Sequence, residues 1–119
     1  MEKILKPVRF VGASRRELRV FPEQARAVAG ESLYRLQLGA LPRDWKPIAN
    51  VGSGACEIRV RTDEGGSVQH RVIYVARFPE AVYVLHAFEK KAQQIPEFQI
   101  ELAAARYNQM LRERNANER

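Results

Sequence analysis

The chain of 119 residues is poor in the residue types that form disulfides and metal sites. It has one cysteine, Cys56, and two histidines. A single thiol excludes an internal disulfide, and it argues against a structural zinc site. We therefore expect a fold that depends on its hydrophobic core, which a chain of this length can bury.

Long hydrophobic runs are also missing. No apolar segment approaches the roughly 20 residues that a helix needs to cross a bilayer. The first ten residues, MEKILKPVRF, lack the apolar segment of a secretory signal. The expectation is a cytoplasmic protein with no membrane partner.

Acidic residues are fewer than basic ones, 14 against 20, so the formal net charge is +6. Such a charge favours polyanions or acidic partner proteins, although it says nothing about fold. With 45% hydrophobic and 29% charged residues the composition is globular. We expect residues 1–119 to form one domain, with a frayed polar tail from about residue 112 to 119.

The first half of the chain predicts one strand and a helical region. VRFVG, residues 8–12, is short and rich in β-branched and aromatic residues, as strands are. Apolar residues at three- and four-residue steps predict a helical hairpin or kinked helix from about Ser14 to Leu38, ended by Gly39 in a left-handed cap. Ser14 and Glu17 have the spacing of a capping box.

The second half predicts a sheet and a final helix. A turn-rich loop, residues 40–54, precedes three β segments: CEIRVRT (56–62), QHRVIYVAR (69–77) and AVYVLHAF (81–88). Gly65-Gly66 suits a hairpin turn between the first two, and helical spacing returns after Pro96. This order predicts an α+β fold of two layers, with an antiparallel sheet of about four strands and helices on one side.

Alternation of side chains along the strands suggests where the chemistry lies. One face of the sheet could carry Arg59, Arg61, Tyr74 and His86, with Lys90 and Lys91 at its edge. Cations neutralise phosphates and aromatic rings stack on unpaired bases, so this set suits RNA. His86 is the natural proton carrier for cleavage through the 2′-OH.

Each of these residues also has an ordinary structural interpretation. A lone histidine at a strand end is more often a hydrogen-bonded or surface residue, and Phe88 is more often part of a core. Arginines that alternate with apolar residues usually form the solvated side of a strand. Glu57 could act as a base or could pair with an arginine. The residues alone indicate a basic α+β domain that binds RNA or another anion.

Four runs and one loop resemble a known family. EIRVR, RVIYVA, VYVLHAFEKKAQ and IELAAARY occur in this order, after the loop DWKPIANVG, residues 44–52. Together they resemble the HigB-type branch of the RelE/ParE toxin superfamily, whose members are often labelled phage-derived or host-inhibition proteins. The similarity runs from about Val8 to Leu111.

The resemblance implies a RelE-like fold and the toxin of a type II toxin–antitoxin pair. Such toxins are generally endoribonucleases that cut mRNA on the translating ribosome without metal or cofactor. A cognate antitoxin, commonly of helix-turn-helix type, covers the active face. By position, the resemblance implies a catalytic set of Arg59, Arg71, His86 and Lys90. The substrate-facing residues would be Lys46, Arg61, Phe88 and Lys91, to which the strand pattern adds Tyr74.

Within this set we expect His86 to act as acid or base, Arg59 and Arg71 to hold the phosphate, and Lys90 to add positive charge. Strand alternation puts Arg71 on the side opposite Tyr74, whereas the resemblance places it near His86. A β-bulge near the hairpin would reconcile the two.

Two other functions stay open. A gyrase-poisoning toxin belongs to the same superfamily, and a phage-derived interaction module would have no activity of its own. The chain departs from the related sequences at Ala92, where a threonine is usual. It departs again at Glu97–Gln99, where further basic residues are usual.

Overall fold

The computed structural model describes residues 4–62 and 69–117, which form one sheet flanked by helices. Along the chain the elements are β1 (Val8–Phe10), α1 (Ser14–Arg19), α2 (Glu23–Gln37), β2 (Trp45–Pro47), β3 (Ala55–Val60), β4 (Gln69–Val75), β5 (Val82–Lys90) and α3 (Glu97–Asn117). The turn expected at Gly65-Gly66 lies outside the described residues.

The sheet has five strands in the order β1-β5-β4-β3-β2. Strands β2 to β5 pair antiparallel, and β1 pairs parallel with β5. The predicted α+β class and the three β segments are confirmed. The fifth strand, β2, falls in the segment that was expected to be a loop. It is short and contains Pro47, and an edge strand tolerates a proline because one side of it needs no hydrogen-bond donor.

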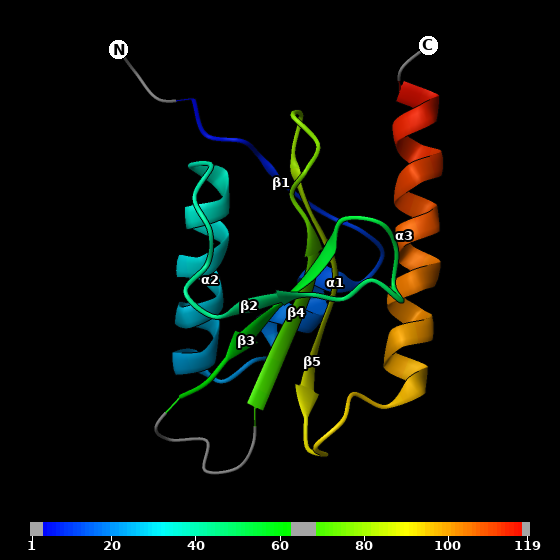
Figure 1. Ribbon diagram of the computed structural model, residues 1–119. Helices are drawn as coiled ribbons and strands as arrows, with labels where there is room; N and C mark the ends of the chain where they lie inside the picture. Colours follow the sequence, from blue (N-terminus) through cyan, green and yellow to red (C-terminus); the bar gives the residue numbers. More distant parts are fainter. Residues whose placement is uncertain (1–3, 63–68, 118–119) are drawn as a thin grey trace.

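Helices lie on both faces of the sheet, where the sequence pattern placed them together on one side (Figure 1). The core with α3 contains Ile73, Leu85, Tyr107 and Met110, and the core with α2 contains Ala29, Leu33, Ile58 and Val72. Strand β4 contributes alternate residues to the two cores, which explains why its sequence is apolar in both registers. The sheet is therefore buried on both sides over most of its centre.

The helical region after β1 is a pair of helices, as predicted, and Gly39 follows α2 with a φ of +84°. The predicted capping box is wrong. The Ser14 hydroxyl donates to the carbonyl of Val84 at 2.9 Å, and the structure shows no side-chain cap at the start of α1. Glu17 likewise binds residues of β5 and α3. The two side chains that a capping box would use, those of Ser14 and Glu17, therefore make tertiary contacts instead.

Helix α3 starts just after Pro96, as predicted, but it continues through Asn117. The expected fraying of the tail from residue 112 stays a prediction. Arg114 lies in this part of the helix, where its guanidinium is 3.5 Å from the centre of the Phe78 ring and donates to Glu80. These contacts attach the end of the helix to the connection between β4 and β5.

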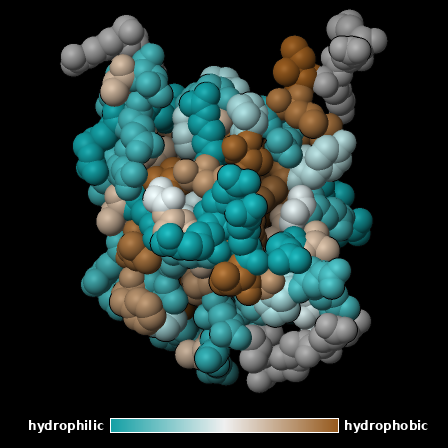
Figure 2. Space-filling view, turned by 180° about the vertical axis from the view of Figure 1, so that it is seen from behind, coloured by the Kyte–Doolittle hydropathy of each residue, from teal (hydrophilic) through white to brown (hydrophobic). Residues whose placement is uncertain are grey.

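The surface is mostly hydrophilic. Seen from behind, teal side chains predominate and the hydrophobic ones form several small groups (Figure 2). Among the described residues, none of the helices combines the length and apolarity that a bilayer span requires. Charge is therefore the surface property that is most relevant to a functional site.

Candidate functional site

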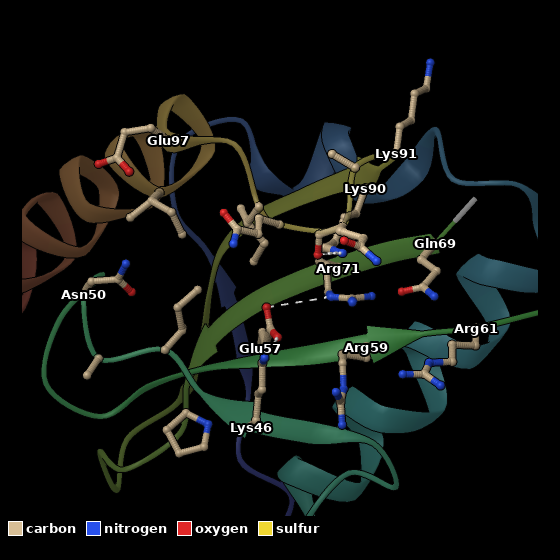
Figure 3. Close-up of a pocket in the computed structure, with 18 residues that line it drawn as sticks. Lys46, Asn50, Glu57, Arg59, Arg61, Gln69, Arg71, Lys90, Lys91 and Glu97 are labelled. Carbon is tan, nitrogen blue, oxygen red and sulfur yellow. Dashed lines mark hydrogen bonds and ion pairs between the residues drawn. The ribbon is translucent and has the colours of Figure 1, made fainter. Parts of the chain in front are cut away.

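A hollow of about 1030 Å³ opens on the sheet between β2, the hairpin side of β3 and β4, and the segment from β5 into α3 (Figure 3). We call it the basic pocket, because six cations line it: Lys46, Arg59, Arg61, Arg71, Lys90 and Lys91. Two carboxylates, Glu57 and Glu97, are also part of its lining. The structure thus brings together six of the predicted site residues from four strands and from the segments that follow β3 and β5.

Strand register explains why these cations converge. Arg59 of β3 lies directly opposite Arg71 of β4, and Gln69 of β4 lies opposite Lys90 of β5. Facing residues on adjacent strands have Cβ atoms about 5 Å apart, so their side chains project from the same face. Residues far apart in the sequence therefore meet in one hollow.

Two carboxylates hold four of the six cations. Asp44 binds Arg59 at 2.7 Å and lies 3.5 Å from Arg61. Glu57 lies 3.6 Å from the Lys46 ammonium and 3.8 Å from Nε of Arg71. Like charges would repel one another at this density, and the carboxylates offset that repulsion.

The pair formed by Glu57 and Arg71 is buried at the floor of the basic pocket. The side chains are 1% and 6% exposed. Burial lowers the pKa of the Arg71 guanidinium, and the negative charge of Glu57 opposes this effect. Oε2 of Glu57 and Nε of Arg71 have no hydrogen-bond partner among the described residues.

Lys90 lies where the basic pocket meets the end of β5. Its ammonium donates to the carbonyl of Gln93 at 2.7 Å. Desolvation and the nearby positive charges of Arg71 and other cations lower the pKa of Lys90, and Glu57 partly opposes them. A lysine with a lowered pKa releases its proton more readily than usual, which suits it for proton transfer.

His86 does not line the basic pocket. It is 3% exposed, and its ring stacks on Phe88 with 4.9 Å between the centroids. Nδ1 lies 2.9 Å from the carboxylate of Glu17, and Nε2 lies within hydrogen-bond distance of the Gln99 side-chain oxygen. Both ring nitrogens are thus engaged by protein groups, so neither faces the hollow where a substrate would bind.

Tyr74 lies on the opposite face of the sheet from Arg59, which corrects the predicted grouping. It is 2% exposed in the core formed with α2, and burial raises the pKa of its phenol, as does its contact with Cys56. Phe88 is also buried, in the core formed with α3. The pocket lining therefore contains neither of the two expected aromatic rings.

The expected conflict over Arg71 is resolved by pairing. Because Arg71 lies opposite Arg59, it reaches the basic pocket without any bulge at the hairpin. The irregularity lies further along, where Ile73 pairs with His86 but Tyr74 pairs with Val84. Leu85 is the extra residue on β5, and it reverses the alternation of the side chains that follow.

Sequence reasoning did not find Asp44 or the contacts of Glu17 and Gln99. Asp44 lies 15 residues before Arg59, and no local pattern links the two. Gln99 occupies one of the positions where the related sequences carry basic residues, and here it binds His86. Within residues 4–62 and 69–117, no cluster of three or more His, Cys, Asp or Glu residues could hold a metal ion.

A family model described as "Phage derived protein Gp49-like (DUF891)" matches residues 16–108. The match begins in α1, includes every strand from β2 to β5, and ends within α3, so it contains all the residues that line the basic pocket. No curated protein matches the chain.

Proposed function

Because the chain belongs to the family of Gp49-like phage-derived proteins, we propose that it is the toxin of a type II toxin–antitoxin pair. Its activity would be that of a HigB-type endoribonuclease, cutting mRNA on the ribosome without metal or cofactor. The observation that carries this proposal is the basic pocket, in which six cations share one hollow. Lysine and arginine side chains neutralise phosphates, and single-stranded RNA presents phosphates at every nucleotide.

The proposed reaction uses the chemistry of RNA itself. The 2′-hydroxyl loses its proton and attacks the adjacent phosphorus, and the leaving 5′-oxygen takes up a proton. Arg59 and Arg71 would hold the phosphate and stabilise the charge that develops on it. Lys90 in its neutral form would accept the proton of the 2′-hydroxyl and then give it to the leaving 5′-oxygen, since desolvation and nearby cations lower its pKa.

His86 takes a positioning role in this proposal. Its contacts with Glu17 of α1 and Gln99 of α3 hold both helices against β5. The strand then places Lys90 four residues further on, at the edge of the basic pocket. Loss of His86 would affect activity through the position of Lys90 rather than through a missing proton.

The proposed partner is a cognate antitoxin of helix-turn-helix type that covers the basic pocket. The net charge of +6 favours an acidic segment of that partner, because complementary charges speed association. The ribosome would deliver the mRNA, and its own phosphates would add to the attraction.

The test is controlled expression of the wild type and of the Arg71→Ala, Lys90→Ala and His86→Ala variants. Transcript 5′ ends and DNA supercoiling are measured after induction. We expect cuts within translated regions, and we expect Arg71→Ala and Lys90→Ala to slow cleavage by about 10²- to 10³-fold. Arg112→Ala, which removes an exposed cation from the far part of α3, is the matched control and should cut normally.

Other outcomes would refute the proposal. Growth arrest with intact mRNA and altered supercoiling would identify a gyrase poison. The absence of both arrest and cleavage would identify an interaction module. Cleavage that persists in Lys90→Ala but is lost in a folded His86→Ala variant would return the proton-transfer role to His86.

A further inference from the structure

Glu57 stands between two cations at the floor of the basic pocket without a good hydrogen bond to either. Figure 3 shows its carboxylate directed at Arg71, with Lys46 on the other side. The distances are 3.8 Å to Nε of Arg71 and 3.6 Å to the Lys46 ammonium. Hydrogen bonds between nitrogen and oxygen are normally 2.7–3.2 Å long. The arrangement is therefore an ion pair held slightly apart.

This separation costs stability. Leaving a buried charged donor or acceptor without its hydrogen bond carries the full cost of removing that group from water. Oε2 of Glu57 and Nε of Arg71 are both in this condition among the described residues. Both residues line the basic pocket, so a ligand that enters it lies next to this pair.

A phosphate group can take the place of the carboxylate beside Nε of Arg71. Guanidinium groups bind carboxylate and phosphate through the same donors, and the two non-bridging oxygens of a phosphodiester can reach two cations at once. By contrast, Asp44 makes a bond of 2.7 Å to Arg59 and has no such mismatch. Among the buried side chains of the described residues, the atoms left without a hydrogen bond are those of the Glu57–Arg71 pair.

We infer that Arg71 and Lys46 form a phosphate subsite that Glu57 occupies in the ligand-free protein. A phosphodiester of the RNA displaces the carboxylate and forms the hydrogen bond to Nε of Arg71. Glu57 thereby sets the affinity of the site and keeps weakly binding anions out. This inference rests on the proposed function, because that function supplies RNA as the ligand.

The experiment measures binding of a short RNA whose riboses are all 2′-O-methylated, so that it cannot be cut. Wild type, Glu57→Gln and Glu101→Gln are compared. Glutamine keeps the shape of the side chain, so Glu57→Gln should bind about tenfold more tightly, as expected when the ligand no longer displaces a charge. Glu101 is an exposed carboxylate of α3 that is not among the residues lining the basic pocket, and its replacement should change affinity by no more than about twofold.

A second measurement uses the wild type, in case the loss of Glu57 prevents folding. The Nε–H resonance of Arg71, assigned by its loss in Arg71→Lys, is followed by NMR during titration with the same RNA. Formation of a new hydrogen bond should shift it progressively to saturation. An Arg71 resonance that is unchanged at saturation would overturn the inference.

The remaining outcomes separate this inference from the proposed function. In one outcome, Glu57→Gln binds the methylated RNA no more tightly than the wild type and does not cut unmodified RNA. This result would show that Glu57 acts as a base, and it would overturn the inference. Tighter binding and a shifted Arg71 resonance, with no cleavage by the wild type, would leave the subsite standing and refute the ribonuclease. No binding by any variant would refute both.

Discussion

At the scale of single residues, Glu17 joins three elements through one carboxylate. It accepts hydrogen bonds from the backbone amide of Ala87 in β5 and from the guanidinium of Arg106 in α3, at 3.2 and 2.7 Å. Its own helix, α1, is thereby fixed against the middle of β5. His86 completes the cluster, because its Nδ1 lies 2.9 Å from the same carboxylate.

Replacing Glu17 by glutamine should destabilise the fold by about 2 kcal/mol. The substitution leaves the 11%-exposed side chain of Arg106 without its counter-charge, and breaking a buried pair is costly even where the intact pair contributes little. Urea unfolding measures the change. Glu101→Gln, at an exposed position of α3, should stay within about 0.5 kcal/mol of the wild type. Equal effects from the two substitutions would contradict the assigned role.

The same carboxylate predicts a dependence of stability on pH. Burial alone would raise the pKa of Glu17, but hydrogen bonds from His86 and Arg106 outweigh it and lower the pKa from 4.5 to about 2. In this interval the unfolded chain binds a proton that the folded chain does not. The stabilisation is therefore complete above about pH 5 and is lost as the pH falls toward 2.

Unfolding of wild type and Glu17→Gln is measured at steps from pH 6 to 2.5. The wild type should lose more stability on acidification, because the variant has no such group to protonate. Glu80, with a pKa also near 2, titrates in both proteins and cancels in the comparison. Parallel curves for the two proteins would exclude Glu17 as a source of the acid sensitivity.

At the scale of elements, α3 has a different task at each end. Its first residues, Glu97 and Ile100, line the basic pocket. Its far end is attached by Arg114, which binds Glu80 and covers the ring of Phe78. The polar composition of residues 112–117 predicts fraying, and the contacts of Arg114 oppose it.

Arg114→Ala should release the last turns of α3. We expect faster hydrogen exchange of amides 110–117 and a loss of about 1 kcal/mol in unfolding free energy, since the hydrogen bonds and the cation–π contact disappear together. Exchange measured by mass spectrometry reports both. Arg112→Ala removes an equal charge from an exposed position on the same helix, so its exchange should match the wild type. Exchange in Arg114→Ala that matches the wild type would show that the helix end is held in another way.

At the scale of the whole molecule, the positively charged side chains are unevenly distributed. Six of the 20 lysines and arginines line the basic pocket, which makes this hollow the natural place for a polyanion. Binding of RNA there releases counterions, so the affinity depends steeply on salt.

Lys46→Ala should reduce the slope of log affinity against log salt concentration by about 0.7, the value for one phosphate contact in single-stranded nucleic acid. Binding of the methylated RNA at several salt concentrations gives the slope. Arg112→Ala has the same net charge, but it lies 12 residues beyond Ile100, or about 18 Å along α3. Its slope should equal that of the wild type. Equal reductions in both variants would show that net charge, rather than the basic pocket, governs binding.

Much of the fold could be predicted from the sequence because its signals are local. The spacing of hydrophobic residues predicted α2 and α3. Gly39 marked the end of α2, because glycine readily adopts the positive φ that is common just after a helix. The strands of the second half follow from their β-branched and aromatic residues. Predictions from local patterns were wrong where a tertiary contact replaced a local one. Ser14 is an example, since its hydroxyl donates to the carbonyl of Val84 instead of capping its own helix.

The sequence by itself determined the charge, the order of the elements and the set of basic residues available to a site, since these depend on composition and on neighbours along the chain. Only the tertiary structure decided which of them share a hollow. One extra residue in β5 changes which side chains face α3, and the pairing of β3 with β4 brings Arg59 against Arg71. Strand register and tertiary contacts join distant segments, so no local pattern reveals that Arg59 meets Arg71 or that Glu17 and Gln99 engage His86.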